Sequence, residues 1–88
     1  MEGLRWNALK NEWLRITRGA SFDDLTDHGK FLGERHHPTR TGQEILLFEY
    51  RGYVWLVPYV RDQKGRFLKT LYPSRKYTKL HRRGVLRL

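Results

Sequence analysis

The stretch "EILLFEYRGYVWLVPYV", residues 44–60, holds two apolar runs around which the rest of the chain is organised. Each run has the length of a β-strand, and the dipeptide Arg51–Gly52 leaves room only for a tight turn between them. Strands joined so closely pair in antiparallel fashion. Both alternating sets of side chains in residues 45–48 are hydrophobic, so we expect both faces of this hairpin to be covered.

Two further strands are expected on either side of the hairpin. "KFLGERH" (30–36) has strand character and precedes the loop "HPTRTGQ" (37–43), while the turn "DQKG" (62–65) leads into "RFLKTLY" (66–72). Such short connections predict a four-stranded antiparallel meander. Pro58 cannot donate a ladder hydrogen bond, so we expect its strand to be bulged there or to lie at a sheet edge.

Helical patterns precede the sheet. In "WNALKNEWLRITRG" four apolar residues recur at helical spacing and share one face, with Asn7 as the cap and Gly19 as the end. These apolar residues are Trp6, Leu9, Trp13 and Ile16. Ser21 and Asp24 form a capping-box pattern that begins a second short helix. Two helices can cover one sheet face, so the C-terminal segment or a partner protein must cover the other.

Residues 76–83 can return to helix, with Gly84 as its end.

Near the N-terminus, Asp23, Asp24 and Asp27 complement the positive end of a helix dipole, and no His or further carboxylate adds a metal-ligand spacing. We therefore expect no metal and no other cofactor.

The length of 88 residues predicts a single domain, 1–88. The chain has no cysteine, which excludes a disulfide scaffold. Its first twenty residues interleave charged and apolar side chains without a continuous apolar run. We expect a soluble cytoplasmic protein that makes no membrane contact.

The net charge of +9 comes from the C-terminal third of the chain. Residues 1–60 carry eight Lys or Arg and eight Asp or Glu, whereas residues 61–88 carry ten Lys or Arg against Asp62 alone. A segment with such an excess of positive charge attracts polyanions, and this attraction weakens as the salt concentration rises. The plain alternative is a solvated tail that keeps the protein soluble.

Two segments resemble the BrnT family, toxins of bacterial type II toxin–antitoxin systems within the RelE-like ribonuclease superfamily. They are "LRWNALKNEWLRITRGASFDDL" (4–25) and "LKTLYPSRKYT" (68–78), and the resemblance covers residues 4–80. The matching residues are Trp6, Lys10, Asn11, Gly19, Ser21, Phe22, Ser74, Arg75, Lys76 and Thr78. The family has Lys-His-Gly where this chain has "TRG", with Arg18 in place of the His.

The resemblance implies an α+β, RelE-like fold, with two N-terminal helices packed on a four-stranded antiparallel meander sheet and a basic C-terminal segment. It also implies metal-independent cleavage of mRNA, growth arrest and neutralisation by a cognate antitoxin, an RNA substrate, and a toxin–antitoxin hetero-oligomer. The charge of this chain suggests that the contacting segment of the antitoxin, itself a DNA-binding protein, is acidic.

Metal-free RNA cleavage needs a base for the ribose 2′-hydroxyl, a cation for the phosphorane and an acid for the leaving 5′-oxygen. Arg75 offers a fork for phosphate oxygens, and Lys69 a point charge. The imidazole of His81 can donate or accept a proton, and Tyr72 can stack on a base or bind a phosphate. These four are the predicted catalytic residues, without an assignment of base and acid. The predicted RNA contacts are Arg66, Lys76, Tyr77, Lys79 and Lys10.

Strand alternation sorts the side chains of residues 66–72. Phe67, Lys69 and Leu71 point one way, and Arg66, Leu68, Thr70 and Tyr72 the other. A lysine buried between apolar neighbours is costly, so we expect Lys69 on the open face and Leu68 in the core.

Structural or solvent-exposed roles are the alternatives to these assignments. Tyr72 can pack the sheet rim, His81 can sit on an exposed helix face, and His36 and His37, before Pro38, can be structural or solvated. At the level of function, the alternatives to a toxin are a non-catalytic nucleic-acid-binding module and an acidic-partner-binding module.

Overall fold

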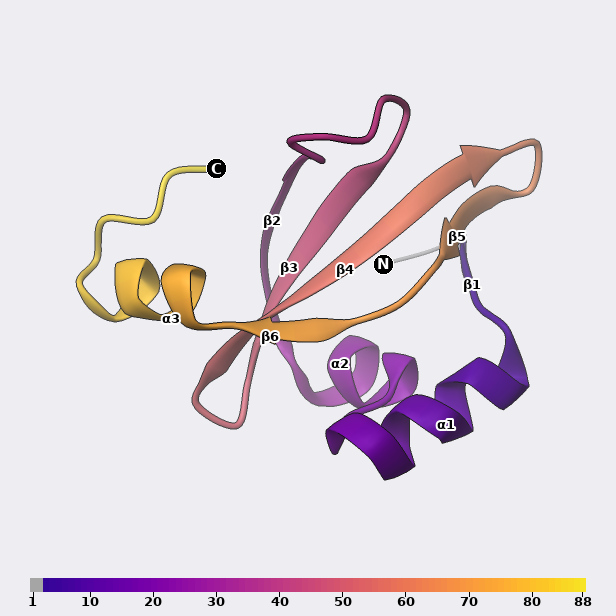
Figure 1. Cartoon of the computed structure of the whole chain (residues 1–88), viewed down its shortest axis with the longest axis horizontal. Coiled ribbons are helices and arrows are strands. Elements are labelled where there is room, and N and C mark those ends of the chain that lie inside the picture. Colours follow the sequence, from indigo (N-terminus) through magenta and orange to yellow (C-terminus); the bar gives the residue numbers. More distant parts are fainter. Residues whose placement is uncertain (1–2) are drawn as a thin grey trace.

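The computed structural model describes residues 3–88 and has an α+β architecture, as the sequence predicts. The elements are β1 (Leu4–Arg5), α1 (Ala8–Arg18), α2 (Phe22–His28), β2 (Lys30–His36), β3 (Glu44–Tyr50), β4 (Tyr53–Asp62), β5 (Gly65–Leu68), β6 (Tyr72–Ser74) and α3 (Arg75–Arg82). One sheet has the order β1-β5-β4-β3-β2, and β6 also pairs with β4. Helices α1 and α2 lie on one side of this sheet and α3 on the other (Figure 1).

The antiparallel meander β2-β3-β4-β5 is confirmed. Its central turn has two residues with positive φ, 51° at Arg51 and 81° at Gly52, and Tyr50 pairs directly with Tyr53. Two successive left-handed residues match the right-handed twist of a hairpin. Glycine takes this conformation freely, and Arg51 takes it because the two-residue turn requires it.

The sheet is larger than predicted. The short β1 pairs with β5 in parallel, with Leu4 opposite Arg66 and Arg5 opposite Phe67. The predicted strand 66–72 is broken into β5 and β6, which pair with different parts of β4. The description of four strands and two helices is therefore corrected to a mixed six-stranded sheet with three helices in the described part of the chain.

The break in the partner strand lies opposite Pro58. Tyr59 pairs with Leu68 and Leu56 with Tyr72, so the three residues 69–71 face the two residues 57–58. The backbone N–H of Lys69 still donates to the Pro58 carbonyl at 2.8 Å, but proline returns no hydrogen bond. The expectation that the strand of Pro58 is itself bulged or lies at an edge is therefore wrong: β4 is regular and paired on both sides, and the extra residue lies opposite it, between β5 and β6.

The extra residue reverses the alternation of side chains that the sequence predicts. Leu68 and Leu71 are both fully buried on the side of α1 and α2, whereas Tyr72 packs on the opposite face. The prediction is confirmed for Leu68 and for the exposed Lys69, and it is wrong for Leu71 and Tyr72. A one-residue insertion exchanges the faces of every residue that follows it.

Two cores cover the two faces of the sheet. The larger lies under α1 and α2 and includes Leu14, Phe22 and Tyr59. The smaller contains Ile45, Leu47, Val54 and Leu56, against which Leu32, Tyr72, Tyr77 and Leu86 pack. The C-terminal segment, one of the two expected possibilities, thus covers the second face.

The bounds and caps of α1 agree with the sequence. Asn7 accepts a hydrogen bond from the backbone of Lys10, and Gly19 ends the helix with φ 78°. Three of the four residues of the expected apolar face, however, point away from the sheet, since Leu9 is 83% exposed, Ile16 81% and Trp13 48%. The fourth, Trp6, packs on the larger core and stacks on Phe22. The buried residues of the helix are Asn11 and Leu14.

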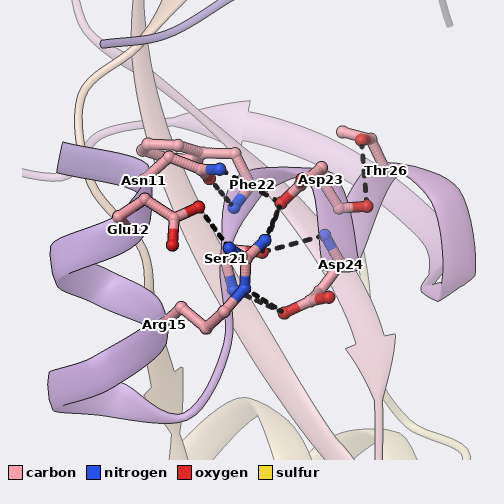
Figure 2. Close-up of polar contacts among 8 residues, drawn as sticks. All are labelled: Asn11, Glu12, Arg15, Ser21, Phe22, Asp23, Asp24 and Thr26. Carbon is pink, nitrogen blue, oxygen red and sulfur yellow. Dashed lines mark hydrogen bonds and ion pairs between the residues drawn. The ribbon is translucent and has the colours of Figure 1, made fainter. Parts of the chain in front are cut away.

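A polar network between α1 and α2 accounts for this orientation (Figure 2). The side-chain oxygen of Asn11 accepts the backbone N–H of Phe22 at 2.7 Å, and its amide donates to Asp23 at 3.2 Å. The Arg15 guanidinium donates to Asp23 at 2.9 Å and to Ser21 at 3.0 Å. These bonds satisfy buried polar groups only if Asn11 faces inward, which turns Leu9 and Ile16 outward.

This network predicts acid sensitivity. Hydrogen bonds from Ser21 and then Asn11, together with the charge of Arg15, hold the pKa of Asp23 below its usual range. Because the unfolded chain binds this proton at higher pH, the stabilisation is present above the ordinary Asp pKa of about 3.9 and is lost as pH falls through the lower folded-state pKa.

Urea unfolding between about pH 5 and pH 2 should therefore show a smaller acid loss of unfolding free energy in Asp23→Asn than in the wild-type protein. The effect is modest, since the Asp23 side chain is 42% exposed. Asp27→Asn, at an exposed acid of the same helix, is the matched control. Equal pH dependence of Asp23→Asn and the wild-type protein would contradict this assignment.

Within residues 3–88, no helix has both the length and the apolar character needed to cross a membrane.

Candidate nucleic-acid interface

Two separate surfaces carry four of the nine predicted site residues. The first, here named the loop pocket, is a cavity of about 210 Å³ lined by His37, Arg40, Gln43, Pro58, Lys69, Thr70 and Tyr72. The second, named the α3 groove, has a volume of about 390 Å³ and is lined by Tyr53, Arg75, Thr78, Lys79, Arg82 and Arg83.

The loop pocket forms where the β2–β3 loop meets the break between β5 and β6. The loop is closed by the backbone N–H of His37, which donates to the Gln43 carbonyl at 3.0 Å. On the opposite wall, the extra residue facing Pro58 takes Lys69 and Thr70 out of the regular ladder. The proline in β4 thereby shapes a concave site at the sheet edge.

His37 has a structural role and a free ring nitrogen. Its Nδ1 accepts the backbone N–H groups of Thr39 and Arg40, each at 3.2 Å. These bonds assign the proton of the neutral ring to Nε2. The expected structural role of His37 is confirmed for Nδ1, and the residue also lines the loop pocket.

The chemistry of the loop pocket suits a phosphate. Lys69 is exposed, with Nζ 5.6 Å from the centre of the Phe67 ring, and Tyr72 is half-buried between the smaller core and the pocket. With His37 and Arg40 the pocket presents an imidazole, a phenol and two cations, and none of its lining residues is acidic. Such a set of donors is complementary to the charge of a phosphodiester.

The α3 groove lies between α3 and the β3–β4 turn. Arg75, Lys79 and Arg82 recur at spacings of four and three and so share one helix face. Arg82 donates to the Gly52 carbonyl at 2.8 Å, and its guanidinium lies 5.9 Å from the centre of the Tyr53 ring. These contacts hold the helix against the turn.

Buried hydrogen bonds hold the helix on the edge of β4. Thr78 is only 4% exposed, and its hydroxyl accepts the Val54 backbone N–H at 2.8 Å and donates to the Ser74 carbonyl at 2.5 Å. The Ser74 side chain caps α3 by accepting from the Tyr77 backbone at 3.1 Å. The predicted C-terminal helix is confirmed, with its start at Arg75 and Gly84 just after its end.

The four predicted catalytic residues do not come together. Lys69 and Tyr72 line the loop pocket, whereas Arg75 lines the α3 groove. His81 lies apart from both, with Nε2 3.1 Å from a carboxylate oxygen of Glu49. This contact joins α3 to β3, and it gives His81 a structural partner.

The predicted RNA contacts are likewise divided. Lys79 lines the α3 groove, while Lys76 lies 5.8 Å from the Tyr77 ring centre, near Arg35 at 5.3 Å from the same ring. Arg66 is occupied inside the fold, since it pairs with Glu34 at 3.6 Å and lies over the Tyr59 ring. Lys10 lies over the Trp13 ring on α1, on the other side of the sheet from α3 (Figure 1).

Sequence reasoning missed residues on both surfaces. Arg40 comes to the loop pocket from the "HPTR" loop, and Tyr53 comes to the α3 groove from the end of a tight turn. The His-Pro pair in the sequence marks the loop that contributes Arg40. The position of this loop beside residues 69–72, however, depends on how the strands pair in the sheet. Arg82 and Arg83 lie in the basic segment and carry no separate signal.

No group of three or more His, Cys, Asp or Glu side chains able to hold a metal ion is found in the described residues. Comparison of the chain with protein-family models, with curated proteins and with solved structures finds no match.

Proposed function

We propose that this protein is the toxin of a bacterial type II toxin–antitoxin system, a RelE-like ribonuclease that cleaves mRNA in the cytoplasm without a metal. The observation that carries the proposal is the loop pocket, where His37, Arg40, Lys69 and Tyr72 surround one cavity without an acidic neighbour in its lining. The resemblance of residues 4–25 and 68–78 to BrnT toxins supports the same function.

The chemistry assigned to the pocket is an internal transfer of the phosphoryl group. The ribose 2′-oxygen attacks the adjacent phosphorus, the bond to the 5′-oxygen breaks, and a 2′,3′-cyclic phosphate and a 5′-hydroxyl form. Lys69 and Arg40 stabilise the charge of the phosphorane, and His37 donates its Nε2–H to a phosphoryl oxygen. The Tyr72 hydroxyl protonates the leaving oxygen, and the 2′-hydroxyl proton passes to water.

Arg75 takes a binding role in this proposal. It lines the α3 groove, not the loop pocket, so its contact with RNA lies away from the reacting phosphate. His81 is assigned no part in the reaction because Glu49 already occupies its Nε2.

The proposed antitoxin has a docking surface on α1. Leu9, Trp13 and Ile16 form an exposed apolar stripe on that helix. Lys10 and Arg18 flank it, with their charged groups 4.8 Å and 5.6 Å from the Trp13 ring centre. Two copies of this chain would bring like charges together there, so an amphipathic segment with acidic residues fits better. Such a partner gives a hetero-oligomer.

A non-catalytic nucleic-acid-binding module is the second candidate function. The α3 groove favours it, because its cations can hold a polyanion without any of the loop-pocket residues. Salt-sensitive binding of RNA that stays intact would distinguish this function from cleavage.

Growth of a bacterial host tests the proposal directly. Induction of the wild-type gene alone should arrest growth and fragment mRNA, and Lys69→Ala should relieve the arrest because the pocket loses a phosphate-binding cation. Lys64→Ala is the matched control, since it removes an exposed lysine from the β4–β5 turn. Unimpaired growth with abundant, folded wild-type protein would overturn the toxin assignment.

A further inference from the structure

The α3 groove combines four cations with an exposed aromatic ring. Arg75, Lys79, Arg82 and Arg83 line it, and the Tyr53 ring, 44% exposed, lies at the end of the β3–β4 turn. None of the groove-lining residues is acidic. This site belongs to neither core and takes no part in the chemistry assigned to the loop pocket.

The charges of the groove are uncompensated. In the described part of the chain, none of Arg75, Lys79 and Arg83 forms an ion pair. Side chains four residues apart on a helix are neighbours, so Arg75 and Lys79, like Lys79 and Arg83, repel one another at close range. A bound polyanion relieves this repulsion, and each bound phosphate releases its counterions.

The Tyr53 ring restricts which kinds of polyanion fit the groove. Arg82 is held by the Gly52 carbonyl at 2.8 Å and lies 5.9 Å from the Tyr53 ring centre, so the ring has a cation beside it. An aromatic ring beside cations is the arrangement that holds an unstacked base next to its own phosphate. In a duplex the bases are already stacked and paired, so they offer no free face to the ring.

We propose that the α3 groove binds single-stranded nucleic acid, with successive phosphates on Arg75, Lys79 and Arg83 and one base stacked on Tyr53. The inference rests on the proposed function only in naming RNA as the natural ligand, for which the groove supplies a second contact outside the loop pocket. The geometry of the groove does not depend on cleavage.

Fluorescence anisotropy with a labelled oligothymidylate of about fifteen nucleotides tests the groove, with a site of this size being typical of single-strand binders. This DNA strand lacks the 2′-hydroxyl, so binding is measured without the cleavage reaction. The double variant Arg75→Ala/Lys79→Ala should weaken binding and lower the slope of log K against log salt by about 1.4, or about 0.7 for each lost phosphate contact. Tyr53→Ala should weaken binding about tenfold, and Tyr53→Phe should retain it.

The double variant Arg61→Ala/Lys64→Ala is the matched control. It removes the same charge from the end of the β4–β5 hairpin, far from α3 (Figure 1), and should leave the Kd within about twofold of the wild-type value. Equal weakening in the two double variants would overturn the inference, because net charge alone would then explain binding. Equal affinity of the wild-type protein for the single strand and for a duplex of the same length would also overturn the inference. The same holds if polyglutamate competes with the DNA strand and Tyr53→Ala binds that strand with wild-type affinity.

Parallel incubation of the wild-type protein with an oligoribonucleotide separates this inference from the proposed function. Intact RNA together with groove-dependent binding of the DNA strand supports the groove and counts against a ribonuclease. Cleaved RNA, together with an affinity for the DNA strand that is unchanged in the groove variants, supports the ribonuclease and overturns the inference about the groove.

Discussion

Replacement of His37 by alanine should slow RNA cleavage about 10²- to 10³-fold, the loss expected for one preorganised donor to a charged transition state. We propose that the Nε2–H of His37 is such a donor, because His37 lines the loop pocket and the backbone of Thr39 and Arg40 occupies Nδ1. Tyr72→Phe should slow cleavage about 10²-fold or more, since the proposed proton donor to the leaving oxygen is lost while the ring still packs on the smaller core. Single-turnover cleavage of an oligoribonucleotide measures both rates.

Two controls separate chemistry from folding in this experiment. His37→Asn keeps a side-chain oxygen for the two backbone N–H groups of the turn but removes the imidazole, so slow cleavage by both His37 variants points to the ring itself. His81→Ala should cleave at close to the wild-type rate because the structure pairs this residue with Glu49. Wild-type rates in the His37 and Tyr72 variants would rule out the loop pocket as the reacting site.

Leu14→Ala should lower the free energy of unfolding by about 2–5 kcal/mol, whereas Ile16→Ala should change it by no more than about 0.5 kcal/mol. Both residues are large and apolar and lie two positions apart in α1. Leu14 is 0% exposed and belongs to the larger core, while Ile16 is 81% exposed. Only the removal of the Leu14 side chain leaves a cavity.

Urea denaturation of the two variants, followed by circular dichroism, measures the difference. Sequence periodicity alone places Ile16 on the packed face, so it predicts the reverse order of effects. A loss of several kcal/mol in Ile16→Ala, with a small loss in Leu14→Ala, would show that α1 is rotated from the orientation described.

Local signals in the sequence predict the ends of the N-terminal helices and the central turn well. Asn7 and Gly19 bound α1, and the Ser21 and Asp24 capping box begins α2, because each satisfies backbone groups within one turn of its own position. The turn at 51–52 likewise depends only on its own dihedral angles. Interactions of this range can be read directly from neighbouring residues.

The direction in which elements face depends on distant residues. The spacing predicts that Trp6 shares a face with Leu9, Trp13 and Ile16, but Trp6 packs on the larger core. Hydrogen bonds between Asn11 and the next helix decide that the other three point outward. The sequence of α1 alone does not show that its orientation is set by the hydrogen bonds of a buried asparagine, at the cost of exposing three apolar side chains. The partner groups of this asparagine exist only once α2 is in place.

The candidate site shows the same division. Of the eight site residues that the basic segment predicts, Lys69, Tyr72, Arg75 and Lys79 line one of the two surfaces. The other four, Arg66, Lys76, Tyr77 and His81, line neither. The separation of the first four into two surfaces follows from the break opposite Pro58. The sequence predicts a bulge or an edge in the strand of Pro58 itself, whereas the extra residue lies between β5 and β6.

The sequence by itself determined the positive charge of residues 61–88, the helix caps and the antiparallel hairpin, since each depends on composition or on neighbours along the chain. Only the tertiary structure decided that His37 meets Lys69 in one pocket and that Tyr53 meets α3 in another. The physical reason is register: one extra residue between β5 and β6 exchanges the faces of all that follow, and strand pairing across the sheet sets where that residue lies.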